Sequence, residues 1–109
     1  RFHSMEPKEV DRKFLNLDKD AFWVGYFGRL VEEKGLRDLM NAFSKLKFHN
    51  KRILIIGSGP LQDKLDQMAE HLNLSDSYKR LPQVSSDQIA TYMRALDVFC
   101  LPSHTKNNW

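Results

Sequence analysis

The sequence predicts an α/β fold in which a mostly parallel sheet lies between two layers of helices. Short apolar runs that suit buried strands alternate with longer stretches whose apolar residues recur at helical spacing. Each cycle of strand and helix takes roughly 25 to 30 residues, which favours right-handed βαβ crossovers between parallel strands. Because 109 residues leave room for one compact unit at most, we expect a truncated, Rossmann-like three-layer sandwich of about four strands and three helices.

The first two cycles are predicted from residue 21 onward. Residues 22–27 are aromatic and β-branched enough for a buried strand, which Gly28 ends. One apolar helical face follows, made of Leu36, Leu39, Met40, Phe43 and Leu46. Residues 53–56 are a second short apolar run, and residues 57–60 are a tight turn. Residues 61–72 then have helical spacing, and Pro60 suits the first helical position.

The third cycle begins with a weaker strand at residues 78–81. Ser85 and Gln88 predict a capping box, with Val84 and Ile89 placed as a hydrophobic staple. The expected buried face of this helix consists of Ile89, Tyr92, Met93 and Leu96. Residues 97–101 predict a fourth strand. Residues 1–20, by contrast, are charged and show no apolar period, so we predict an irregular connector there.

Charge and composition limit the partners and the kinds of site that we expect for this chain. The 17 Lys and Arg residues are scattered among 14 Asp and Glu residues, so we expect no nucleic-acid partner. A basic patch formed on folding would suit anionic lipid headgroups, which leaves peripheral membrane contact open. The lone Cys100 excludes an internal disulfide and fits a reducing cytoplasm. The four histidines show no metal-ligand spacing, so we expect no metal site.

The turns after the predicted strands are the candidate site, because ligands of parallel α/β sheets bind beyond the carboxyl ends of the strands. Residues 28–35 hold two glycines and two cations before a helix. Gly28 lets a ligand approach the backbone, Arg29 offers a fork of donors to phosphate oxygens, and Lys34 adds a point charge. This pattern suits a diphosphate. The alternative is that both cations are solvated loop residues.

The second turn carries Gly57 and Gly59, which can also bring the backbone close to a ligand. The alternative is that these glycines only join a strand to a helix. The first turn lacks the Gly-Lys-Ser/Thr ending of a P-loop, and residues 57–62 lack the third glycine of a dinucleotide fingerprint. ATPase and NAD-binding functions are therefore disfavoured.

Three segments together, residues 24–35, 54–60 and 96–103, resemble the retaining GT-B glycosyltransferases of family four, which use nucleotide-sugar donors. The resemblance covers nearly the whole chain and implies part of the C-terminal, donor-binding domain. It implies that Arg29 and Lys34 are catalytic cations that neutralise the departing diphosphate, without a metal and with no cofactor besides the donor substrate. It also implies that Gln83 and Val84 lie at the base of the nucleotide. The donor-binding residues that it implies are Gly28, Arg29, Lys34, Gly57, Gly59, Pro60, Gln83 and Val84.

The chain departs from the family pattern in two ways. Pro82 stands where the family often has glycine, and the family's two glutamates, separated by seven residues, would follow only after Trp109. We therefore expect residues 1–20 to be a connector from a missing N-terminal domain, and residues 21–109 to be an incomplete donor domain. We expect this piece to transfer no sugar alone and to self-associate through uncovered strand edges.

The function expected is that of a fragment of a cytoplasmic glycosyltransferase, with the inner face of the membrane left open as its location. Its parent would transfer a sugar from a nucleotide-diphosphate sugar to an unidentified acceptor, with retention of configuration. Two alternatives stay open: a non-catalytic Rossmann-like module that binds a nucleotide or a protein, and a fragment of a sugar-nucleotide 2-epimerase. Residues 28–35 and 97–103 favour the transferase over the epimerase.

Overall fold

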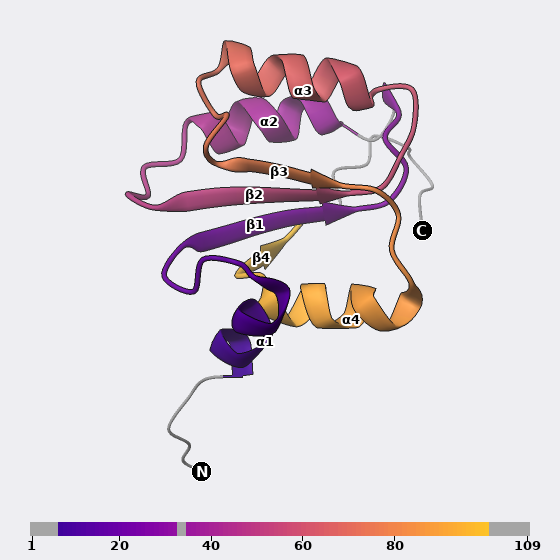
Figure 1. Cartoon of the computed structure of the whole chain (residues 1–109). Coiled ribbons are helices and arrows are strands. Elements are labelled where there is room, and N and C mark those ends of the chain that lie inside the picture. Colours follow the sequence, from indigo (N-terminus) through magenta and orange to yellow (C-terminus); the bar gives the residue numbers. More distant parts are fainter. Residues whose placement is uncertain (1–6, 33–34, 101–109) are drawn as a thin grey trace.

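The computed structural model describes residues 7–32 and 35–100, which form a parallel sheet with helices on both faces (Figure 1). The sheet order is β3-β2-β1-β4, and every strand pair is parallel. In chain order the elements are α1 (Pro7–Leu15), β1 (Phe22–Phe27), α2 (Leu36–Ser44), β2 (Lys51–Ile56), α3 (Gln62–His71), β3 (Tyr78–Leu81), α4 (Ser86–Ala95) and β4 (Val98–Phe99).

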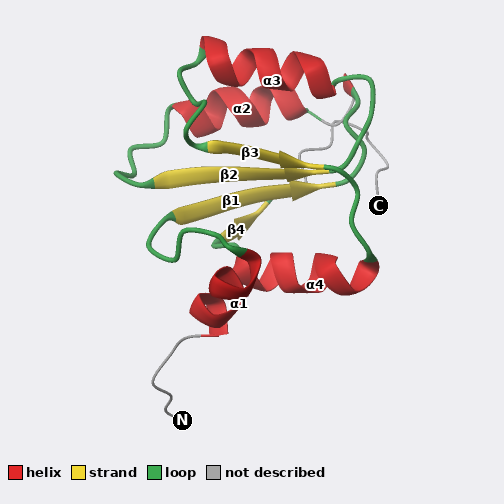
Figure 2. Cartoon of the chain, in the orientation of Figure 1, coloured by secondary structure: helices red, strands yellow, loops and turns green. Residues whose placement is uncertain are grey.

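The helices divide into two layers. Figure 2 shows α2 and α3 along one face of the sheet and α1 and α4 along the other. The chain adds β2 and β3 on one side of β1 and then returns to add β4 on the other side. Because the crossovers between parallel strands are right-handed, this reversal of direction places α4 on the opposite face of the sheet from α2 and α3. The predicted Rossmann-like α/β fold is thereby confirmed.

Each face of the sheet has its own apolar core. The strand side chains alternate between the two cores, because successive residues of a strand point to opposite faces. Val24, Ile53 and Ile55 pack under α2 and α3, whereas Leu54 and Ile56 pack on the side of α4. The central strand β2 is thus apolar on both faces, which explains why its run reads as continuously hydrophobic.

The prediction that residues 1–20 are irregular was wrong for residues 7–15, which form α1. The two apolar side chains on the outer face of this helix, Val10 and Phe14, are exposed, and Phe14 is 81% exposed. The buried residues of α1 include Asp11 and Arg12, and Arg12 is only 4% exposed. Because polar residues dock this helix, apolar periodicity was unable to reveal it.

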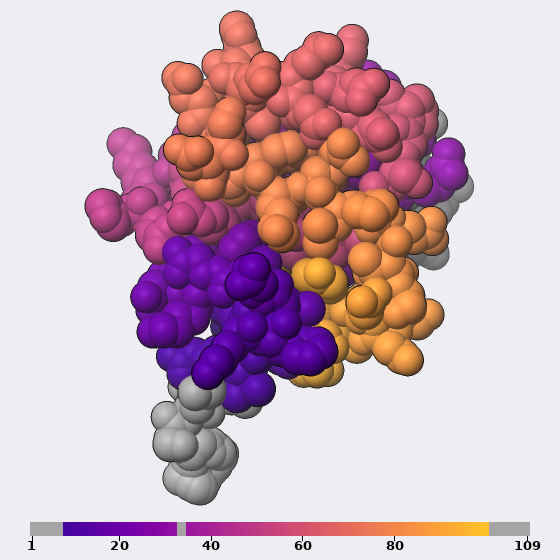
Figure 3. All heavy atoms as spheres, in the orientation of Figure 1, coloured from indigo at the N-terminus to yellow at the C-terminus, as the bar shows by residue number. Residues whose placement is uncertain are grey.

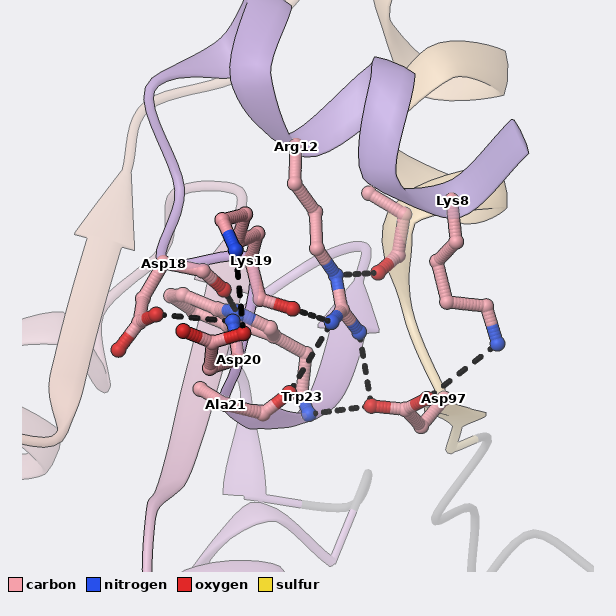
Figure 4. Close-up of polar contacts among 9 residues, drawn as sticks. Lys8, Arg12, Asp18, Lys19, Asp20, Ala21, Trp23 and Asp97 are labelled. Carbon is pink, nitrogen blue, oxygen red and sulfur yellow. Dashed lines mark hydrogen bonds and ion pairs between the residues drawn. The ribbon is translucent and has the colours of Figure 1, made fainter. Parts of the chain in front are cut away.

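Arg12 is the centre of this docking (Figure 4). Its Nε donates to the carbonyl of Ala95 at 2.8 Å, and its Nη1 donates to the carbonyls of Lys19 and Ala21, both at 3.0 Å. Its Nη2 donates to Asp97 Oδ2 at 2.7 Å. The guanidinium therefore joins α1 to the approach to β1 and to the loop between α4 and β4.

The space-filling view shows α1, in indigo, lying against the orange and yellow atoms of α4 and β4 (Figure 3). A second ion pair, from Arg94 Nε to Asp11 Oδ2 at 3.1 Å, joins the same two helices. α1 is thus part of the same packed unit as the sheet.

Several predicted boundaries and burial assignments changed. β4 has only two residues, Val98–Phe99, where residues 97–101 were predicted, and Leu101 lies outside the described residues. Leu46 and Met93, both predicted on buried faces, are exposed at 36% and 42%. The capping box at Ser85 and Gln88 is confirmed, since both of its hydrogen bonds are present.

Within the part of the chain that the structure describes, none of the helices has the length and apolar character needed to span a membrane.

Candidate functional site

A pocket of about 540 Å³ lies at the carboxyl ends of β1, β2 and β3. This is the edge of the sheet at which parallel α/β proteins bind their ligands. The pocket is lined by residues from three consecutive turns and from the first turn of α4. They are Phe27, Gly28, Arg29, Ile56, Gly57, Ser58, Gln83, Val84, Ser86 and Ile89.

The turn after β1 supplies the charge of the pocket. Of the described residues that line it, Arg29 carries the formal charge, and its side chain is exposed. The Arg29 carbonyl accepts a hydrogen bond of 2.7 Å from the hydroxyl of Tyr26. Burial raises the pKa of Tyr26 above its ordinary value, which favours the protonated hydroxyl that donates this bond. The turn that carries Arg29 is therefore hydrogen-bonded to a core residue.

The turn after β2 packs its backbone directly against the turn after β1. Gly57 has φ of 148°, and a Cβ atom there would collide with the carbonyl oxygen of Gly28. Gly59 has φ of 156°, and its Cβ would lie 2.6 Å from the carbonyl oxygen of Leu30. Backbone contact between the turns is thus sufficient to require both glycines. The interpretation that Gly57 and Gly59 are required by the backbone geometry of the turn is therefore supported, whether or not a ligand also approaches them.

Backbone hydrogen bonds extend this contact across all three turns. Gly28 N–H donates to the carbonyl of Ile56 at 3.0 Å, and Leu30 N–H donates to the carbonyl of Ser58 at 3.1 Å. Gly57 N–H donates to the carbonyl of Leu81 at 3.0 Å. The floor of the pocket is therefore a continuous hydrogen-bonded layer, which suits a preformed binding site.

The third wall of the pocket is the start of α4. Ser85 caps this helix by accepting from the N–H of Gln88, and Ser86 begins the helix at the pocket. A helix N-terminus presents free N–H groups and the positive end of the helix dipole. The N–H groups at this end of α4 and the side chain of Arg29 are therefore two sources of hydrogen-bond donors for an anion in the pocket.

The structure brings together Gly28, Arg29, Gly57, Gln83 and Val84, all of which were predicted as site residues. Gly59 and Pro60 are not among the residues that line the pocket. Pro60 also precedes the helix that it was predicted to begin, because the N-cap of α3 is Leu61. Lys34 lies outside the residues that the structure describes.

Sequence reasoning missed the other lining residues, which are Phe27, Ile56, Ser58, Ser86 and Ile89. The apolar residues of this set were predicted to be core residues. The sequence pattern of a strand end or of a helix face is the same whether it borders a core or a pocket. The capping box at Ser85 was the signal available for Ser86, because it marks where α4 begins.

The other ionisable clusters serve the scaffold. Asp66 accepts from Arg80 Nε at 2.8 Å and from the Tyr78 hydroxyl at 2.8 Å. The hydrogen bond from Arg80 is the main reason that the pKa of Asp66 lies below its ordinary value. Among residues 7–32 and 35–100, no three His, Cys, Asp or Glu side chains are grouped so that they could hold a metal ion.

Comparisons with known proteins agree on one family. The family model for glycosyl transferases group 1 matches residues 7–108. The chain is 35% identical over 101 residues to TuaC of Bacillus subtilis, which is named as a teichuronic acid biosynthesis glycosyltransferase; the match covers 93% of this chain and 24% of TuaC. The chain spans about a quarter of the length of the curated relatives it matches.

Solved structures are similar over nearly the whole chain. Anabaena HepE in complex with UDP has a TM-score of 0.77 and 25% identity, over 94% of this chain and 29% of HepE. The C-terminal domain of LpcC, a glycosyl transferase group 1 family protein from Francisella tularensis, has a TM-score of 0.81 over 96% of this chain and 57% of that one. At 21% identity, the second likeness shows the fold alone.

Proposed function

This chain belongs to the glycosyl transferases group 1 family, and on that premise we propose that it forms the part of a glycosyltransferase that binds the nucleotide diphosphate of a sugar donor. The family resemblance inferred from the sequence is confirmed. The activity of the parent protein, its donor and its acceptor belong to the proposal, because the chain spans only part of its relatives.

The observation that carries the proposal is the pocket at the carboxyl ends of the strands. Its volume of about 540 Å³ lies within the range of small-ligand sites. Phe27, Ile56, Val84 and Ile89 provide apolar walls for a base and a ribose, and Arg29 provides the cation for phosphate oxygens. The similarity to HepE, whose structure contains UDP, supports this assignment.

The chemistry gives Arg29 its role. When the bond between the sugar and the diphosphate breaks, negative charge develops on the departing phosphate oxygen while the sugar becomes oxocarbenium-like. A fixed guanidinium at the diphosphate stabilises that charge more in the transition state than in the bound donor, so it accelerates the reaction. We assign the same role to Lys34, on the pattern of residues 28–35. We propose that these cations act without a divalent metal and that the parent enzyme retains anomeric configuration.

The binding claim is tested by calorimetric titration of the chain with UDP, GDP and ADP in the presence of EDTA. We expect one of them to bind with about millimolar affinity, near −4 kcal/mol. Arg29→Ala and Lys34→Ala should each weaken binding. Lys64→Ala is the matched control, because Lys64 is an exposed cation of α3 outside the pocket lining. Equal losses in all three variants would contradict a specific role for Arg29 and Lys34.

We propose that residues 1–109 bind the donor without transferring its sugar, since the chain spans about a quarter of its relatives' length. Measurable sugar transfer by this chain would contradict that.

For the parent protein we propose a cytoplasmic location with contact to the inner face of the membrane. Sedimentation with anionic vesicles tests the membrane contact. We also propose self-association along β4, which is an edge strand of the sheet within the described residues and exposes Val98. A monomer in light scattering at high concentration would contradict it.

A further inference from the structure

The turn that presents Arg29 is held on both sides of that residue. On one side, Gly28 N–H donates to the carbonyl of Ile56 at 3.0 Å. On the other side, Leu30 donates to the carbonyl of Ser58 at 3.1 Å and accepts from Leu61 N–H at 3.0 Å. These bonds fix the neighbours of Arg29 to the turns around them, and they leave the Arg29 peptide itself to be held by something else.

Tyr26 supplies that contact. Tyr26 is 3% exposed and belongs to the core under α2 and α3, so its ring is packed on all sides by buried residues. From there the hydroxyl reaches out of the core and donates to the Arg29 carbonyl at 2.7 Å. A buried, packed ring thus ends in a single polar contact, and that contact is made to the backbone of the cation in the pocket.

Gly28 lies between these two residues and makes the contact feasible. A Cβ atom at Gly28 would lie 2.9 Å from the Tyr26 hydroxyl oxygen, inside van der Waals contact. The absence of a side chain at residue 28 therefore leaves space for the hydroxyl to pass to Arg29. The three residues Tyr26, Gly28 and Arg29 form one local arrangement.

We propose that Tyr26 is a positioning residue that holds Arg29 in the orientation needed to bind the diphosphate, an inference that rests on the function proposed above. A flexible arginine loses conformational freedom when it closes on a ligand, and that loss weakens binding. A carbonyl pinned to a rigid ring restricts the backbone rotation at Arg29 before the ligand arrives. Tyr26 thereby improves binding without touching the ligand.

The test is the variant Tyr26→Phe, which removes the hydroxyl and keeps the ring. The Arg29 carbonyl belongs to an exposed residue, so water can replace the lost donor and the fold should persist. Tyr78→Phe is the matched control. The Tyr78 hydroxyl also makes one hydrogen bond, to Asp66 at 2.8 Å, but Tyr78 does not line the pocket.

The ligands are the tightest binder among UDP, GDP and ADP, and the nucleoside with the same base. We expect Tyr26→Phe to weaken diphosphate binding about fivefold, the size of one net hydrogen bond. Nucleoside binding should change less than about twofold, because Arg29 serves the phosphates. Tyr78→Phe should change neither affinity. In an Arg29→Ala background, Tyr26→Phe should have no further effect on diphosphate binding, because the cation that it positions is gone.

The outcomes separate this inference from the function on which it rests. If the unmutated, folded chain binds none of the three diphosphates, the proposed function is refuted and the role of Tyr26 with it. If diphosphate binding depends on Arg29 and not on Tyr26, the inference alone is refuted. An equal loss for diphosphate and nucleoside, or a loss that persists beside Arg29→Ala, would show that Tyr26 only stabilises the fold.

Discussion

Arg12→Met removes the guanidinium that docks α1, and it should destabilise the chain severely. Arg12 is 4% exposed, and its guanidinium makes four hydrogen bonds, to the carbonyls of Ala95, Lys19 and Ala21 and to the carboxylate of Asp97. Methionine keeps much of the side-chain stem and leaves all four acceptors without this donor. The substitution therefore isolates the polar contacts from the packing.

The magnitude follows from these contacts. Breaking a buried ion pair by removing one partner costs about 3 to 5 kcal/mol. The Asp97 side chain is 24% exposed and keeps its bonds from Trp23 N–H and Lys8, so the lower end applies. We expect a loss of about 3 kcal/mol in the free energy of unfolding, a large part of the roughly 5 to 15 kcal/mol available to a domain.

Urea denaturation followed by circular dichroism measures this loss. Arg37→Met is the matched control, because Arg37 makes an exposed ion pair with Glu32 at 2.6 Å. Exposed pairs of this kind contribute up to about 1 kcal/mol. If Arg12→Met lost no more stability than Arg37→Met, the buried arginine would not be what anchors α1 to the sheet.

Three further predictions concern the same scaffold. Gly57→Ala should lower the free energy of unfolding by more than about 2 kcal/mol, because its Cβ meets the Gly28 carbonyl at positive φ; Ser58→Ala in the same turn should cost far less, and equal urea midpoints for the two variants would oppose the close packing of the turns. Ser85→Ala should cost about 1 kcal/mol by removing the cap of α4, whereas a thermal melt identical to that of the unmutated chain would argue against the cap. Burial acts to raise the pKa of Asp97, but the hydrogen bonds from Trp23 N–H, Arg12 and Lys8 outweigh it and lower the net pKa from its ordinary 3.8. The stability that Asp97 adds is thus present above about pH 5 and is lost as the pH falls through that lowered pKa; Asp97→Asn should flatten the acid limb of the stability curve, and an unchanged limb would contradict the assignment.

The part of the fold that apolar patterns control was predictable. β1 and β2 were recognised because both of their faces are buried, and α2 because Leu36, Met40 and Phe43 fall on one face. α1 was missed because a buried arginine docks it, and two of the partners of that arginine, the Ala95 carbonyl and the Asp97 carboxylate, lie far along the chain. The hydrogen bond from Arg12 to Ala95 joins residues 83 positions apart, and no local pattern encodes such a pair.

The candidate site was predictable where it depends on turns. Gly28, Arg29 and Gly57 follow directly from strands that were recognised, so their meeting at one edge was expected. The contribution of Ile89 to the pocket was not predictable from the sequence. A helix residue that borders both a core and a pocket shows the same helical spacing of apolar residues as one that borders a core alone. The role inferred for Tyr26 also required the structure, since an aromatic residue in a buried strand gives no sign of where its hydroxyl points.

The central claim is that the pocket at the carboxyl ends of β1, β2 and β3 binds a nucleotide diphosphate. The most direct measurement is a titration of the isotopically labelled chain with UDP, GDP and ADP, followed by backbone amide chemical shifts. We expect saturable shifts at Gly28, Arg29, Gly57, Gln83 and Ser86, with the shifts at residues 28 and 29 lost in Arg29→Ala. Saturable shifts confined to other surfaces, or no shifts in a chain whose spectrum shows it to be folded, would contradict it.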